Sequence, residues 1–270
     1  MSDLFTASPG QALLRMVAPI SVGFVMLMAI DFADALIADF ISVESLAIVG
    51  YCYSVLYFMI AIGFGLNQGM TIVASHDYIK GGTVSLYQWL IQSSYMAMMV
   101  SVVLCASVLM SLQLQWVNSD FLLTYLSDIE PYLYVLLCAV FPTFLLLLLC
   151  AMCQIKGQPE NIRDVLVVMF IGTCILHPLL ALYLGYGLVG VALSKVINVI
   201  LGVCFMLYRL IDREALADTS FRLSLRHQGD LCHHAIPASL IQLLVPVYLL
   251  YLTHIVTHYG VTALAGFHLG

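Results

Sequence analysis

The stretch Ala29-Ile-Asp-Phe-Ala-Asp-Ala-Leu-Ile-Ala38 places two carboxylates three residues apart inside the first long apolar run of the chain. On a helix, Asp31 and Asp34 share one face. The run from Arg15 to Ala38 is long enough to cross a bilayer as a helix. Both acids then lie at membrane depth, where a charge is costly unless it is paired, solvated or protonated. Asp31 and Asp34 are therefore the first candidates for function.

The composition of the whole chain extends this interpretation. Of 270 residues, 63% are hydrophobic and 9% are charged, and the mean hydropathy is +1.04, whereas a soluble domain carries about a quarter charged residues. The apolar runs lack the strict alternation of barrel strands, which favours helices. We expect an all-α, multi-pass protein of the cell (inner) membrane, surrounded by the lipid bilayer and with no nucleic-acid partner.

The positive charges indicate how the chain crosses the membrane. Seven spans are predicted, at about 15–38, 46–74, 86–112, 131–154, 163–184, 187–209 and 233–258. Eight of the nine Lys and Arg residues lie outside these spans or at their ends, and the connections after the first, third and fifth spans contain none. The connection 113–130, which carries only acids, is expected on the outside. The positive-inside rule therefore predicts a cytoplasmic N-terminus.

An internal repeat suggests how the spans are grouped. Ala18–Gly50 aligns with Ile236–His268 at one constant offset without a gap, so that Pro19 meets Pro237 and Ser21 meets Ser239. The seventh span then repeats the first in the same orientation, as in a parallel repeat. We expect a six-helix lobe at 1–210, a cytoplasmic amphipathic linker at 211–231, and the first helix of an incomplete second lobe at 232–270. If the chain is a fragment, the missing C-terminal lobe is its partner.

Three segments carry a family resemblance. The stretch Phe32–Gly50 resembles the first-helix signature of the multidrug and toxic compound extrusion (MATE) family, which has an Asp, an apolar patch, an external turn, then Leu-Ala and a Gly. Leu176–Leu180 followed by Gly187–Ser194 is similar to the fifth-to-sixth helix junction of that family. Ile236–Ala265 is similar to its seventh helix.

The resemblance implies an antiporter of twelve helices that exports organic cations and drugs in exchange for H⁺ or Na⁺, with no other cofactor. Asp34 occupies the position of the family's first-helix Asp, which takes part in cation coupling. The chain departs from the family pattern in two helices. It has Thr173 and His177 where the fifth helix often carries Asn and Asp, and it has Lys195 where the sixth helix usually carries a small residue or Thr.

Two alternatives stay open at this point, and a third is not expected. The chain could be a truncated gene fragment without transport activity of its own. It could be a lipid-linked sugar flippase of the same superfamily, which should show a strongly basic central cavity. An intramembrane enzyme is not expected, because Ser75-His76 lies at a span end without a glycine-rich nucleophile turn or metal-ligand spacing.

Four polar residues define the candidate coupling site. Counted from the external ends of their spans, Asp34 is roughly 6 Å deep, Asp31 and His177 roughly 10 Å, and Lys195 roughly 12 Å. Opposite charges at a common depth are expected to face one another or a shared wet cavity, which predicts a proton-exchanging cluster. The structural alternative is an Asp31–Lys195 ion pair and a His177 that only hydrogen-bonds to a carbonyl.

Four further residues are candidates for substrate contact. Tyr51 and Tyr57 could stack on a flat cationic drug, and Asn67 and Gln68 are polar groups within the second span. Each has a structural alternative, since tyrosines at span ends anchor the interface and Asn67-Gln68 can hydrogen-bond between helices. No metal site is expected, because the i, i+4 histidines of the seventh span have no third ligand placed by the sequence.

Overall fold

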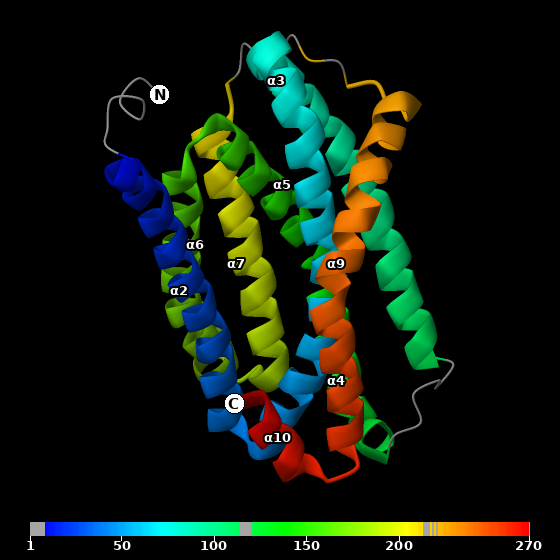
Figure 1. Cartoon of the computed structure of the whole chain (residues 1–270). Helices are drawn as coiled ribbons and strands as arrows, with labels where there is room; N and C mark the ends of the chain where they lie inside the picture. Colours follow the sequence, from blue (N-terminus) through cyan, green and yellow to red (C-terminus); the bar gives the residue numbers. More distant parts are fainter. Residues whose placement is uncertain (1–8, 114–119, 213–216, 218, 220, 270) are drawn as a thin grey trace.

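The computed structural model describes residues 9–113, 120–212, 217, 219 and 221–269, and this part of the chain contains helices and no strands. In chain order they are α2 (Pro9–Ile41), α3 (Val43–Gln113), α4 (Asp120–Leu137), α5 (Val140–Lys156), α6 (Pro159–His177), the π-helical turn η1 (Pro178–Tyr183), α7 (Gly187–Leu210), α9 (Leu225–Thr257) and α10 (Val261–Leu269). The long helices run up and down along one axis (Figure 1). The predicted all-α fold is confirmed.

Five stretches of the described chain are long and apolar enough to cross a membrane. They are Val43–Leu112, Thr124–Lys156, Pro159–Tyr183, Gly187–Leu210 and Leu225–Thr257. The 33-residue helix α2, which contains the first predicted span, also has the length to cross but is not among these five.

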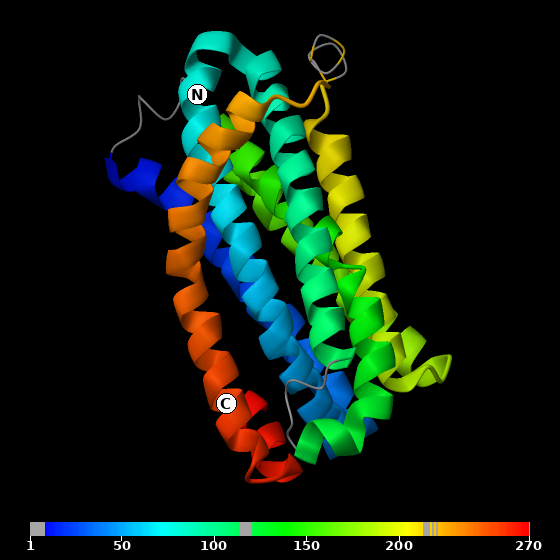
Figure 2. The same cartoon turned by 90° about the vertical axis from the view of Figure 1, so that its right-hand side faces the viewer.

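Helix α3 is two antiparallel helices joined with almost no loop. Gly82 has φ 63° and ψ −150°, a region that residues with a side chain rarely adopt. The chain reverses direction there, so the segments before and after Gly82 lie side by side as a hairpin (Figure 2). The second and third predicted spans are the two arms of this hairpin.

The prediction of a connection over 113–130 is wrong from Asp120 onward, because α4 begins there; its external side stays a prediction. The acids in this segment had marked it as a connection. In α4, however, Ile129, Leu133 and Leu136 are buried while Asp128 is exposed, which is the pattern of an amphipathic helix. A turn at 138–139 separates α4 from α5, so the predicted fourth span lies in a single membrane-crossing stretch, Thr124–Lys156, that is interrupted by this turn.

The first arm of α3 packs against α9 through small residues. A Cβ added to Gly65 would lie 2.6 Å from Ser239 Cα, and one added to Gly69 would lie 2.9 Å from Ala235 Cα. This Gly-x-x-x-Gly contact brings the two backbones together. Figure 1 shows α2 and α9 descending in the same direction, as a parallel repeat requires. The division into lobes and linker stays a prediction.

The first residues of the segment between α7 and α9 are hydrogen-bonded to a side chain of the second α3 arm. The Tyr87 hydroxyl donates a hydrogen bond to the Leu210 carbonyl at 2.5 Å and accepts one from the Asp212 amide at 2.7 Å. Tyr87 itself is 1% exposed. The end of α7 is therefore fixed to α3.

The same α3 arm also holds the start of α9. Gln92 donates to the Arg222 carbonyl at 2.6 Å and accepts from the Ser224 amide at 3.0 Å, and the Tyr95 hydroxyl donates to the Phe221 carbonyl at 2.9 Å. Gln92 is fully buried. These contacts fix the position at which α9 enters the bundle.

Candidate functional site

Helices α6 and α7 pack along two stripes with four-residue spacing, which keeps each stripe on one helix face. The stripes are Val165, Met169, Thr173 and His177 on α6, and Gly190, Ser194, Asn198 and Gly202 on α7, and all eight residues are buried. Small residues on α7 let the helices approach closely. A Cβ on Gly190, for example, would lie 2.7 Å from the Leu180 carbonyl oxygen of η1. The polar members of the two stripes therefore meet inside the bundle.

The end of α6 is shaped by Pro178, which has no N–H to donate to the preceding turn. His177 is the last residue of α6, and the wider turn η1 follows, with the Leu184 amide bonded to the Leu179 carbonyl at 2.9 Å. Such π-helical turns often occur at functional sites. His177 thus stands at a change of helix geometry.

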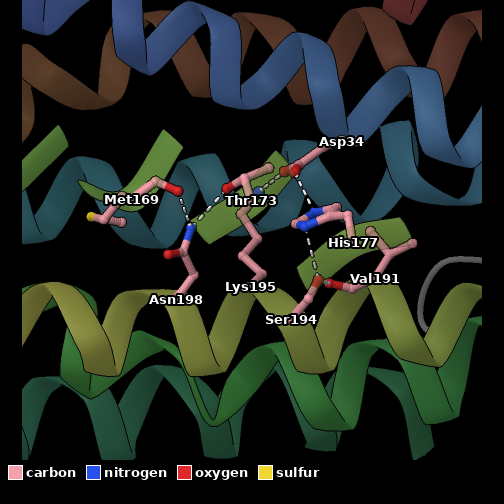
Figure 3. Close-up of polar contacts among 8 residues, drawn as sticks. All are labelled: Asp34, Met169, Thr173, His177, Val191, Ser194, Lys195 and Asn198. Carbon is pink, nitrogen blue, oxygen red and sulfur yellow. Dashed lines mark hydrogen bonds and ion pairs between the residues drawn. The ribbon is translucent and has the colours of Figure 1, made fainter. Parts of the chain in front are cut away.

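Asp34 of α2 faces both α6 and α7 (Figure 3). Its Oδ2 atom lies 2.5 Å from Lys195 Nζ, and its Oδ1 atom lies 2.6 Å from His177 Nε2. The side chains of Asp34 and His177 are 4% and 1% exposed, and that of Lys195 is 18% exposed. The Oδ1–Nε2 contact lacks hydrogen-bond alignment, so it is a close electrostatic contact. The acid is shared between an ammonium and an imidazole.

The second nitrogen of His177 faces a hydroxyl that has two acceptors. Ser194 Oγ lies 3.0 Å from His177 Nδ1 and 2.7 Å from the Val191 carbonyl oxygen. A serine hydroxyl has one proton to donate. If that proton points to Nδ1, the imidazole is neutral, and if it points to Val191, Nδ1 itself can carry a proton and donate to Ser194. The two states differ by one proton and require no movement of heavy atoms.

The Lys195 ammonium also lies over an aromatic ring. Its Nζ is 4.7 Å from the centroid of Tyr53, and the Tyr53 ring is 5.6 Å from that of Tyr57. Asp31 lies close enough to Tyr53 and Lys195 to interact electrostatically with both. The alternative of an Asp31–Lys195 ion pair is wrong, because the carboxylate in contact with the ammonium is that of Asp34.

A second polar contact lies one helical turn away. Asn198 donates from Nδ2 to Thr173 Oγ1 and to the Met169 carbonyl oxygen, both at 2.7 Å. Its Oδ1 atom is buried without a hydrogen bond and packs against Gly172. Ser194 and Asn198 are members of the site that were not predicted from the sequence. Their four-residue spacing between Gly190 and Gly202 was the signal that could have found them.

The four candidates for substrate contact do not form one site. Tyr51 and Asn67 are separated by about 24 Å along α3 at 1.5 Å per residue. Asn67 is buried and donates to the Leu147 carbonyl of α5 at 2.5 Å, which is the helix-to-helix bond of the structural alternative. Gln68 is exposed and Tyr51 is half-buried. Tyr57, which is 39% exposed beside Tyr53, is the member of the set that adjoins the Asp34 cluster.

The described residues contain no group of three or more His, Cys, Asp or Glu side chains that could hold a metal ion. The Asp34 cluster itself places a carboxylate, an imidazole and an ammonium in contact, and these are groups that can exchange protons. Asp34, His177 and Lys195 come from three helices, so a relative movement of those helices changes all of their contacts at once.

Comparisons with known proteins agree with this architecture. A search of curated protein sequences finds no match. Among solved structures, the inward-facing conformation of a multidrug resistance MATE family transporter of the MOP superfamily matches with a TM-score of 0.76 at 20% identity, over 94% of this chain and 60% of that chain. The outward-facing conformation of such a transporter matches with a TM-score of 0.78 at 20% identity, over 96% of this chain and 58% of that one.

A third solved structure is that of a MOP superfamily transporter from Pyrococcus furiosus, for which a reversed polarity of the binding pocket has been described. It matches with a TM-score of 0.78 at 20% identity, over 94% of this chain and 57% of that chain. At this identity the matches show the fold. The chain spans about three fifths of the length of these solved transporters.

The MatE family model matches residues 19–184, which is more than half of the chain. The matched segment begins in α2 and ends just after η1, so it includes Asp34 and His177. The solved relatives of this family are membrane transporters and not enzymes. The chain belongs to the MatE family and has the fold of its membrane transporters.

Proposed function

We propose that this protein exports small organic cations and drugs across the cell membrane in exchange for protons, and that the Asp34 cluster carries the exchanged proton. The observation that supports this most directly is that the Ser194 hydroxyl lies within hydrogen-bonding distance of two acceptors. The hydroxyl can donate to His177 Nδ1 or to the Val191 carbonyl, at 3.0 Å and 2.7 Å. The imidazole can therefore gain or lose a proton within a fixed frame.

The contacts of the Asp34 carboxylate favour H⁺ over Na⁺ as the coupling ion. One carboxylate oxygen contacts the Lys195 ammonium and the other contacts His177. An ammonium has no lone pair to offer a metal cation, and a Na⁺ ion at Asp34 would have to displace one of these groups. A proton needs no such space, because it can add to a nitrogen that is already present.

Charge counting supports the same conclusion. With a neutral imidazole, the charges of Asp31, Asp34 and Lys195 sum to one negative charge, and a proton on His177 brings the sum to zero. An isolated charge at membrane depth is costly, so the two states differ in their preference for water. The titratable groups that interact electrostatically with Asp34 are Asp31 on the same helix and, on neighbouring helices, Tyr53, Tyr132, His177 and Lys195.

The flippase alternative is less well supported by these contacts. Binding a lipid-linked pyrophosphate needs several unpaired cations inside the bundle. Lys195, the lysine within the predicted spans, is already paired with Asp34 at 2.5 Å. This pairing leaves it little positive charge to offer to an anion.

Proton release on drug binding tests the proposal without requiring a complete transport cycle. The purified chain is titrated with ethidium in weakly buffered detergent, and a pH-sensitive dye reports released protons. We expect close to one proton per bound ethidium for the native chain and almost none for Asp34→Asn. Asp39→Asn is the matched control, because Asp39 is an exposed acid on the same helix.

Ethidium efflux from proteoliposomes then tests transport itself. An imposed pH gradient should drive ethidium efflux that Asp34→Asn abolishes and Asp39→Asn leaves unchanged. Proton release without efflux would mean that the chain has the coupling site but does not transport by itself. Ethidium binding without proton release, at every pH from 6 to 8, would overturn the proposal.

A further inference from the structure

The Lys195 ammonium lies in surroundings that suit a cationic ligand. A carboxylate oxygen of Asp34 is 2.5 Å from Nζ, and the face of Tyr53 is 4.7 Å from it. Asp31 adds a second negative charge nearby. Carboxylates together with an aromatic face are the groups that proteins use to recognise alkylammonium ligands. The position occupied by Nζ is therefore a cation site that the chain fills with its own side chain.

This occupant is held by a flexible stem. Lysine carries its charge on four rotatable carbons, and the Lys195 side chain is 18% exposed while Asp34 is 4% exposed. The lysine is thus the most accessible member of the pair. Its ammonium can leave Asp34 by rotating its side chain toward the exposed side, without a change in the backbone of α7.

We infer that Lys195 is a tethered competitor of the substrate: the positively charged nitrogen of an organic cation replaces the Lys195 ammonium between Asp34 and Tyr53. The inference rests on the proposed export of organic cations and names the part of the substrate that is recognised. Substrate binding and the Asp34–Lys195 ion pair are then mutually exclusive. The site then holds one positive charge more, that of the substrate in addition to that of Lys195, and this added charge favours loss of the proton from His177.

The test is an equilibrium binding measurement at constant pH. Fluorescence anisotropy of ethidium is recorded with the purified full chain in detergent and with Lys195→Met, which keeps most of the unbranched stem and removes the charge. We expect ethidium to bind at least tenfold more tightly to Lys195→Met. Lys195→Arg, which retains the cation, should bind within twofold of the native chain.

Lys156→Met is the matched control, because the Lys156 ammonium also lies over a tyrosine ring, 5.3 Å from Tyr87, but the structure gives it no salt bridge within the described residues. This variant should leave ethidium binding unchanged. Adding Tyr53→Leu to Lys195→Met should remove most of the gain. Affinity that is unchanged or lower in a monodisperse Lys195→Met protein would overturn the inference.

A second comparison does not depend on the stability of the lysine variant. Tyr53→Leu in the native background removes the aromatic face and keeps the ion pair, and we expect ethidium to bind several-fold more weakly. Equal binding by native chain and Tyr53→Leu would also overturn the inference. Because neither assay measures protons, failure here leaves proton release at Asp34 standing, and failure of proton release leaves this competition standing.

Discussion

Removal of Lys195 should destabilise the protein through its effect on Asp34. In Lys195→Met the Asp34 carboxylate, which is 3% exposed as a residue, loses the ammonium at 2.5 Å. Breaking a buried ion pair by removing one partner costs about 3–5 kcal/mol. We expect the lower end of this range, about 3 kcal/mol, because the Lys195 side chain is 18% exposed and His177 can take up a proton beside the acid.

The double variant Asp34→Asn with Lys195→Met removes both charges and should recover most of this loss. Asp34→Asn alone leaves a partly exposed lysine, at a cost of about 1–2 kcal/mol. The coupling free energy between the two positions should then be about 2–3 kcal/mol. The free energy of unfolding of all four proteins is measured by titrating dodecyl maltoside micelles with dodecyl sulfate and recording circular dichroism.

The ion pair of Arg209 with Asp164 is a built-in reference for this cycle. Its two side chains are 44% and 26% exposed and lie 2.7 Å apart, and exposed pairs of this kind contribute about 1 kcal/mol or less. We expect a coupling free energy below 1 kcal/mol there. If the Asp34 and Lys195 substitutions prove additive to within about 0.5 kcal/mol, the ion pair contributes nothing and the reasoning is refuted.

Three further predictions concern packing and hydrogen bonds elsewhere in the bundle. Gly65→Ala should lower the free energy of unfolding by about 1–3 kcal/mol, because the new Cβ lies 2.6 Å from the Ser239 backbone. The control Gly229→Ala, whose Cβ meets nothing within 4 Å, should be neutral or stabilising. Equal effects of the two variants in the same titration would contradict the close contact. Asn198→Leu should cost about 1–3 kcal/mol in that assay, since it removes two buried hydrogen bonds, and no loss would show that these bonds are dispensable. Gln92→Leu should speed hydrogen exchange at the Ser224 amide about tenfold, as expected for the loss of roughly 1.4 kcal/mol of protection. The exchange is measured by mass spectrometry. An unchanged exchange rate would mean that the hydrogen bond from Gln92 does not protect that amide.

The sequence predicted the helical class and a cluster of four residues, three of which are in contact in the structure, because both depend on properties that lie along the chain. Apolar length determines where a helix can cross a bilayer, and counting residues from the span ends gives depth. Asp34, His177 and Lys195 were placed at a common depth in this way, and the structure brings them into contact. Their role in coupling stays a prediction.

The pairing within the cluster could not be read from the sequence, because it depends on how each helix is rotated. Asp31 and Asp34 share a helix face, and a small rotation of α2 decides which of them meets Lys195. The hidden members Ser194 and Asn198 depend on the close approach of α6 and α7 that Gly190 and Gly202 permit. The start of α4 was missed because acidic residues on the exposed side of a helix look like a connection when only charge is considered.

The hydrogen bonds from Gln92 and Tyr95 have a consequence for engineering. They set the register of α9 on α3 at its first turn, independently of how many residues join it to α7. Insertion of a reporter domain before Phe221 should therefore leave the helix in its native alignment. Insertion of a few residues between Ser224 and Ala235 should instead shift the register of α9, so that Ala235 and Ser239 no longer lie opposite Gly69 and Gly65. The segment between α7 and α9 should therefore accept insertions before the residues that Gln92 and Tyr95 hold, and not after them.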